Sequence, residues 1–211
     1  MKKLLFIHRS VGENLIVEGD LYNRITAKKL TLEDFNQNTQ VLRSLNSNTK
    51  MNIQMPGSNT NPDNYSKLFS EEPSEMKDFV LNYDLIMIKS CYPNSNIVNE
   101  KSLEKIHNQY NQIFDFFITK PNKKLIILTS PPLQPIMTKK IRARRALELA
   151  NWLKGKTKSE NIMIIDLFNF LADNNGFLKR KYRRFIPFDS HPNKKANKEI
   201  SNFLAEFIAK L

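Results

Sequence analysis

Short runs of consecutive apolar residues, separated by longer amphipathic segments, are the feature that most constrains the fold of this chain. Such runs occupy residues 3–8, 84–89, 124–129 and 161–166, while residues 51–55 alternate apolar with polar side chains. Strands buried on both faces have continuous apolar sequences, and helices between them let neighbouring strands run parallel. We therefore predict an α/β fold, a three-layer α/β/α sandwich with a five-stranded parallel sheet formed by residues 3–8, 51–55, 84–89, 124–129 and 161–166.

The segments between these strands have the periodicity of helices. Residues 103–118, 141–153 and 192–211 repeat apolar side chains every three or four positions. Residues 31–49 are instead polar and rich in Asn and Gln, which predicts a loop with a short helix. No repeat or linker divides the chain, so we expect residues 1–211 to form a single domain.

The composition restricts the classes of protein to consider. The chain of 211 residues has 33 Lys and Arg against 21 Asp and Glu. The net charge of +12 reflects either a Lys- and Asn-rich composition alone or anionic partners. No apolar run approaches the roughly 20 residues that cross a bilayer, and the apolar run near the N-terminus is too short for a secretory signal. The single Cys91 excludes an intramolecular disulfide and a cysteine-based zinc site. We expect a cytoplasmic location.

Polar residues follow each predicted strand. The chain places Ser10, Gly57, Asn94 or Asn96, and finally Asp189 with His191 in such loops. Parallel strands end at the same edge of a sheet, where open α/β folds bind their ligands, so these residues are expected to converge.

Their types match the requirements of acyl transfer by serine. That reaction needs a nucleophile, a base, a group that orients the base, and hydrogen-bond donors for the oxyanion. Ser10, His191 and Asp189 supply the first three, and the loops of Gly57 and Asn94 supply candidates for the last.

The same residues, in the same order, resemble the sequence blocks of the SGNH hydrolases, also called GDSL-type esterases. Ser10 in FIHRSVGEN matches the nucleophile, and Gly57 in PGS and Asn94 in SCYPN match the oxyanion residues together with Ser10. The segment DSHPN, with Asp189 and His191, matches the final block. The resemblance implies a flavodoxin-like fold and a cofactor-free and metal-free esterase. It also implies a substrate that is a small acyl ester, such as an O-acetylated carbohydrate.

The chain departs from the family pattern in three places. His8 and Arg9 replace the Gly-Asp before the serine, and the third block lacks its glycine, so that Asn96 is an alternative to Asn94. One residue rather than two separates Asp189 from His191, and Phe188 occupies the expected position of the acid. Another group, such as Asp166, is an alternative partner for His191.

Other readings remain open. His8 is an alternative base and Cys91 an alternative nucleophile. The basic clusters at residues 139–145 and 179–184 form a solvated surface or bind an acidic substrate, and nucleic acid is the less favoured partner. An acyltransferase on the same scaffold, or a non-catalytic binder of anionic polymer, are the alternative functions.

Overall fold

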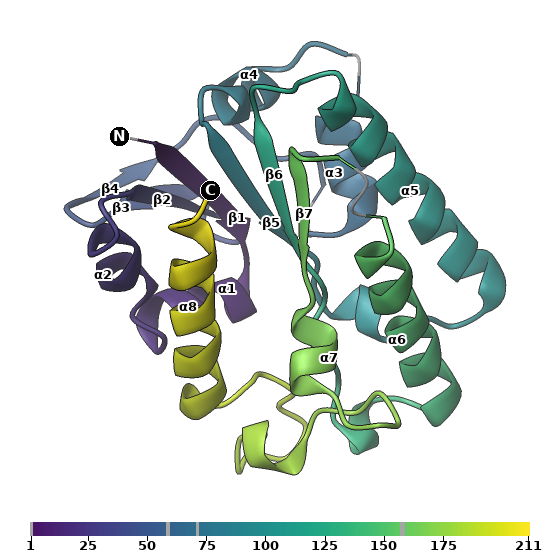
Figure 1. Cartoon of the computed structure of the whole chain (residues 1–211). Helices are drawn as coiled ribbons and strands as arrows, with labels where there is room; N and C mark the ends of the chain where they lie inside the picture. Colours follow the sequence, from purple (N-terminus) through teal and green to yellow (C-terminus); the bar gives the residue numbers. More distant parts are fainter. Residues whose placement is uncertain (1, 58–59, 71, 157–158) are drawn as a thin grey trace.

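The computed structural model describes residues 2–57, 60–70, 72–156 and 159–211. In this part of the chain a seven-stranded sheet has the strand order β4-β3-β2-β1-β5-β6-β7 (Figure 1). The strands are β1 (Lys3–His8), β2 (Thr31–Asn36), β3 (Val41–Ser44), β4 (Ser47–Lys50), β5 (Leu85–Lys89), β6 (Lys124–Leu128) and β7 (Ile162–Ile165).

Five neighbouring strands of the sheet run parallel, as the continuous apolar runs predict. They are β2, β1, β5, β6 and β7. Numbered by their place in the chain, these parallel strands have the spatial order 2-1-3-4-5, which is the flavodoxin-like arrangement. The α/β class and the parallel core of the sheet are therefore confirmed. The remaining strands, β3 and β4, extend the sheet as an antiparallel hairpin.

The second strand lies elsewhere than predicted. Residues 51–55 form no strand, and the polar segment predicted as a loop instead contains β2 and the hairpin. The sequence TLEDFN of β2 does not have the continuous apolar pattern of a buried strand, because it includes Glu33 and Asp34. Asp34 is nevertheless fully buried, where it forms an ion pair with Arg43 and a hydrogen bond with His8. The predicted five-stranded sheet is thus corrected to seven strands within the described residues.

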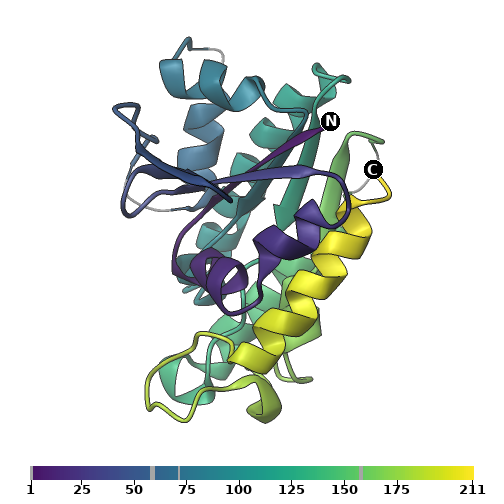
Figure 2. The same cartoon turned by 90° about the vertical axis from the view of Figure 1, so that its left-hand side faces the viewer.

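Helices cover both faces of the sheet (Figures 1 and 2). On one face, Leu4 and Phe6 pack with apolar residues of α1 (Ser10–Val17), α2 (Leu21–Thr26) and α8 (Lys194–Ile208). On the other face, Leu5 and Ile7 belong to the core formed with α3 (Pro62–Leu68), α4 (Glu75–Leu81), α5 (Glu100–Ile118) and α6 (Lys140–Lys154). This alternation along β1 gives the expected layers.

Short elements follow the carboxyl ends of the strands. They are the 3₁₀ helix η1 (Tyr92–Ser95) after β5, η2 (Pro135–Met137) after β6, and α7 (Leu167–Leu171) and η3 (Arg180–Tyr182) after β7. The chain between α7 and α8 runs along the lower end of the molecule in Figure 1. The closing helix begins at Lys194 because the Asn193 side chain accepts a hydrogen bond from the Ala196 N–H, so Pro192 precedes the helix instead of opening it.

In the part of the chain that the structure describes, the helices are all too short or too polar to span a bilayer.

Candidate active site

Ser10 stands at the turn between the central strand β1 and helix α1. β1 ends at His8, Arg9 occupies the N-cap position with extended backbone, and Ser10 is the first residue of α1. The first N–H groups of a helix have no partner within it, so this turn offers backbone donors beside the serine. Ser10 Oγ lies 2.9 Å from Nε2 of His191, which comes from the loop before α8.

A tight turn joins His191 to Asp189. Oδ1 of Asp189 accepts a hydrogen bond from the His191 backbone N–H at 2.9 Å and lies 2.6 Å from His191 Nδ1. An aspartate that bonds the N–H two residues ahead forms an Asx turn. This turn lets an Asp-x-His sequence bring the carboxylate to the ring. Phe188, at the position expected for the acid, has a left-handed φ of 64° and an exposed side chain.

The carboxylate of Asp189 is held in its charged form. Burial raises the pKa of Asp189, but hydrogen bonds from the His191 N–H and ring, together with the nearby Arg184 guanidinium, outweigh it and hold the pKa below its usual value. Arg184 Nε lies 3.8 Å from Asp189 Oδ2, and Arg184 also pairs with Glu18 at 2.7 Å. A charged Asp189 favours the imidazole tautomer with hydrogen on Nδ1, which leaves Nε2 free to accept a proton.

Residues that the sequence analysis did not identify hold this loop in place. The Gln134 side chain donates to the Asp189 carbonyl, and the Gln134 N–H donates to Ser190 Oγ at 3.0 Å. The Tyr92 and His191 rings form a T-shaped pair, with ring centroids 5.4 Å apart. Gln134 carries no local sequence signal, because its role depends on the proximity of two distant loops. Tyr92 lies in the third sequence block, SCYPN, which matches the family pattern only in part because it lacks the glycine.

Asn94 and Gly57 lie in loops at the edge of the sheet where Ser10 lies. Asn94 is in η1 after β5, a direct neighbour of β1, and its Nδ2 is buried without a hydrogen-bond partner among the described residues. The alternative Asn96 is engaged, since its Oδ1 accepts a hydrogen bond from Thr138 at 2.7 Å. The Gly57 carbonyl accepts from Gln37, the residue that follows β2.

Gly57 has a conformation that requires glycine. Its φ of +69° is left-handed, and a Cβ at this position would lie 2.3 Å from Asn64 Oδ1. Hydrogen bonds between Thr60 and Cys91 also connect the Gly57 loop with the Asn94 loop. The Cys91 N–H donates to the Thr60 carbonyl at 3.0 Å, and Thr60 Oγ1 donates to Cys91 Sγ at 2.9 Å.

The alternative catalytic residues are engaged elsewhere. His8 is fully buried, with Nε2 2.7 Å from Asp34 Oδ2 and Nδ1 2.9 Å from the Arg9 carbonyl, so neither nitrogen offers a lone pair to Ser10. Cys91 is buried beside Thr60 and Lys89. Asp166 caps α7 by accepting from the Asn169 N–H, and among the described residues no hydrogen bond or ion pair joins it to His191.

A cavity of about 440 Å³ adjoins the imidazole. Its walls are mostly apolar, and His191, Asp189 and Asn96 add polar groups. The lining residues are Tyr92, Pro93, Asn96, Leu133, Met137, Phe188, Asp189, Ser190 and His191. Its size and apolar walls suit a small acyl group.

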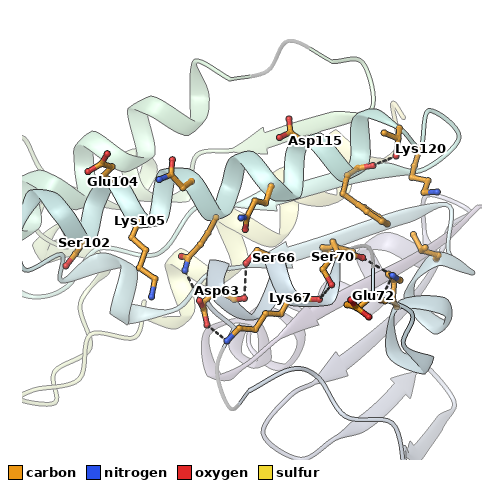
Figure 3. Close-up of a pocket in the computed structure, with 18 of the residues that line it drawn as sticks. Asp63, Ser66, Lys67, Ser70, Glu72, Ser102, Glu104, Lys105, Asp115 and Lys120 are labelled. Atoms are coloured by element: carbon orange, nitrogen blue, oxygen red, sulfur yellow. Dashed lines mark hydrogen bonds and ion pairs between the residues drawn. The ribbon is translucent and has the colours of Figure 1, made fainter.

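A larger groove of about 1890 Å³ lies between α3 and α5 (Figure 3). Three of its charged side chains, Asp63, Lys67 and Lys77, form hydrogen bonds with neighbours in the groove. Asp63, for instance, accepts from Lys67 at 2.7 Å and from Gln109 at 2.9 Å. The groove contains none of the predicted site residues, so the smaller cavity is the better candidate for chemistry. Within the described residues, His, Cys, Asp and Glu form no cluster of three that could hold a metal ion.

Comparisons with family models and with curated proteins give no match. Solved structures do match. A lipase/acylhydrolase from Enterococcus faecalis is 12% identical, with 100% of this chain and 96% of that chain covered and a TM-score of 0.59. A GDSL-like lipase from Bacteroides thetaiotaomicron is 11% identical, covering 99% and 88% with a TM-score of 0.57. A carbohydrate acetylesterase from Sinorhizobium meliloti is 14% identical, covering 99% of both chains with a TM-score of 0.54.

The chain therefore has the fold of the SGNH, or GDSL-type, hydrolases, as the order of its sequence blocks predicts. At this level of identity the likeness establishes the fold. The activity has to be argued from the site.

Proposed function

We propose that this protein is a serine esterase in which Ser10, His191 and Asp189 form a catalytic triad. The observation that carries the proposal is the position of His191, with Nε2 2.9 Å from Ser10 Oγ and Nδ1 2.6 Å from Asp189 Oδ1. In the proposed mechanism, His191 takes the Ser10 proton as Oγ attacks the ester carbonyl. Asp189 orients the ring and stabilises the imidazolium that forms.

The negative charge that develops on the carbonyl oxygen needs donors. We assign this role to the N–H groups of Ser10 and Gly57 and to the side chain of Asn94. The unpartnered, buried Nδ2 of Asn94 supports its part, because a buried donor without a partner is costly unless a ligand satisfies it. The protonated His191 then gives its proton to the leaving alcohol, and an acyl-Ser10 intermediate remains.

Water completes the reaction, with His191 again as the base. The cavity beside His191 favours a small acyl group over a bulky one. An O-acetylated sugar as the ester agrees with the carbohydrate acetylesterase activity of the Sinorhizobium meliloti protein.

The test is hydrolysis of p-nitrophenyl acetate by the wild-type protein and by Ser10→Ala and His191→Ala. We expect each variant to lose activity by a factor on the order of 10⁴ or more, because members of a triad act as a unit. Activity near that of the wild type in either variant would refute the mechanism. A repeat with a sugar acceptor, followed by product analysis, separates hydrolysis from acyl transfer on the same scaffold.

A further inference from the structure

Two segments beside the triad are basic and contain no acidic residue. Residues 130–147 and 174–188 together hold ten Lys and Arg residues and no Asp or Glu. The segments lie side by side, since the Leu178 N–H donates to the Leu133 carbonyl at 2.9 Å and the Gln134 side chain reaches the Asp189 carbonyl. We name residues 135–144 and 179–188 the rim, because both ranges border the cavity that contains His191.

The rim also exposes large apolar side chains. Phe185 is fully exposed, and Ile136, Ile186 and Phe188 are each more than half exposed. Met137 and Phe188 both line the cavity beside His191, so each segment contributes an apolar side chain to it. The chain between α7 and α8 loops outward at this end of the molecule (Figure 2). Single exposed apolar residues are ordinary on a protein surface, whereas a cluster of them marks a binding surface.

Much of the positive charge on the rim is available to an external partner. Arg184 is the exception, since it pairs with Glu18 and approaches Asp189. Among the described residues, no carboxylate forms an ion pair with the remaining exposed basic side chains of the rim, which are Lys139, Lys140, Arg144, Arg180 and Lys181.

We propose that the rim docks on a bilayer that contains anionic phospholipid. Phe185 and Ile186 enter the headgroup region, and the lysine and arginine side chains contact the lipid phosphates. The combination of exposed apolar side chains and unpaired basic side chains favours an anionic bilayer over other partners. A soluble polyanion would satisfy the charges but leave the apolar side chains in water, and a neutral lipid surface would leave the charges unpaired. Docking in this orientation turns the cavity toward the membrane surface.

The test is co-sedimentation of the full chain with vesicles made of equal parts phosphatidylcholine and phosphatidylglycerol, or of phosphatidylcholine alone. We expect binding to the anionic vesicles only. Arg180→Ser with Lys181→Ser weakens it roughly thirty-fold, because each basic residue near the surface contributes about one factor of five. Phe185→Ser with Ile186→Ser weakens it on the order of tenfold or more.

Matched controls lie at the opposite edge of the sheet, where α5 ends and β6 begins. Ile118→Ser removes an apolar side chain that is 57% exposed, against 58% for Ile186, and Lys120→Ser with Lys123→Ser removes the same charge as the rim variant. Both controls are expected to stay within about twofold of wild type, since neither site contacts the rim. Thermal unfolding shows whether each variant is folded.

Failure of the wild-type protein to bind anionic vesicles would overturn the proposal. It would also be overturned if the charge variant weakened binding while the folded Phe185 and Ile186 variant did not, because the rim would then bind polyanions by charge alone. Vesicle binding requires no ester chemistry, so Ser10→Ala is expected to bind like the wild type. The membrane-docking proposal and the esterase proposal are therefore tested separately, and either can be refuted without the other.

Discussion

At the scale of single residues, the contact between Asp189 and His191 shows how a local turn brings a carboxylate to an imidazole ring. The sequence contains an aspartate and a histidine near its end, but their spacing differs from the family pattern. The Asx turn, with Asp189 Oδ1 bonded to both the N–H and the ring of His191, resolves the difference. A sequence pattern predicts the residue types of such a site. The turn depends on backbone angles, such as the left-handed φ of Phe188, that the pattern does not specify.

Asn94 gives a prediction at this scale. Its buried Nδ2 has no partner in the described structure, and Asn96 is bonded to Thr138. If Asn94 donates to the oxyanion, Asn94→Ala lowers kcat for p-nitrophenyl acetate on the order of 10²–10³-fold, the usual effect of removing one such donor. Asn96→Ala, at the alternative position, is expected to cost much less. Steady-state kinetics on both variants decide between them, and the reverse order of effects would assign the role to Asn96.

At the scale of elements, the sequence predicts the buried apolar strands well and the strand β2 poorly. Patterns of apolar residues identified β1, β5, β6 and β7 because burial on both faces requires such residues there. β2 is paired with β1 along its whole length, yet it contains a buried carboxylate, Asp34. That charge is stable only because partners from other strands reach it, and a local pattern cannot show them.

The buried Asp34 makes the stability of this part of the sheet depend on pH. Burial raises the pKa of Asp34, but hydrogen bonds from His8, Arg43 and Tyr22 outweigh it, so the folded pKa lies below the usual value. A depressed pKa contributes stability above the unfolded pKa of about 3.9, and this contribution is lost as the pH falls through the folded pKa. Asp34→Asn is therefore expected to lower the free energy of unfolding by about 3–5 kcal/mol at neutral pH.

Urea denaturation at a series of pH values measures the effect. The difference in unfolding free energy between wild type and Asp34→Asn should be constant near neutral pH and shrink below about pH 4. Asp115→Asn, at an exposed position of α5, is the control and should change little at any pH. A difference that grows in acid would contradict the assignment of a depressed pKa to Asp34.

At the scale of the whole molecule, the topology joins residues that are 181 positions apart in the chain. Parallel strands end at one edge of the sheet, so the sequence alone predicts that the loops with Ser10, Asn94 and His191 share that edge. It does not predict the contacts between loops, such as Gln134 with Asp189 or Thr60 with Cys91, because neither pair has a local signal. The order of the sequence blocks thus identified the fold and the candidate residues, while the supporting contacts needed coordinates.

The central claim is that Ser10 is a nucleophile activated by His191. Labelling with a fluorophosphonate probe, followed by mass spectrometry of the digested protein, tests it most directly because such probes form a lasting adduct with an activated serine. We predict an adduct on the peptide that contains Ser10, absent from Ser10→Ala and strongly reduced in His191→Ala. A wild-type protein that stays unlabelled, or an adduct on another residue that persists in Ser10→Ala, would contradict the account.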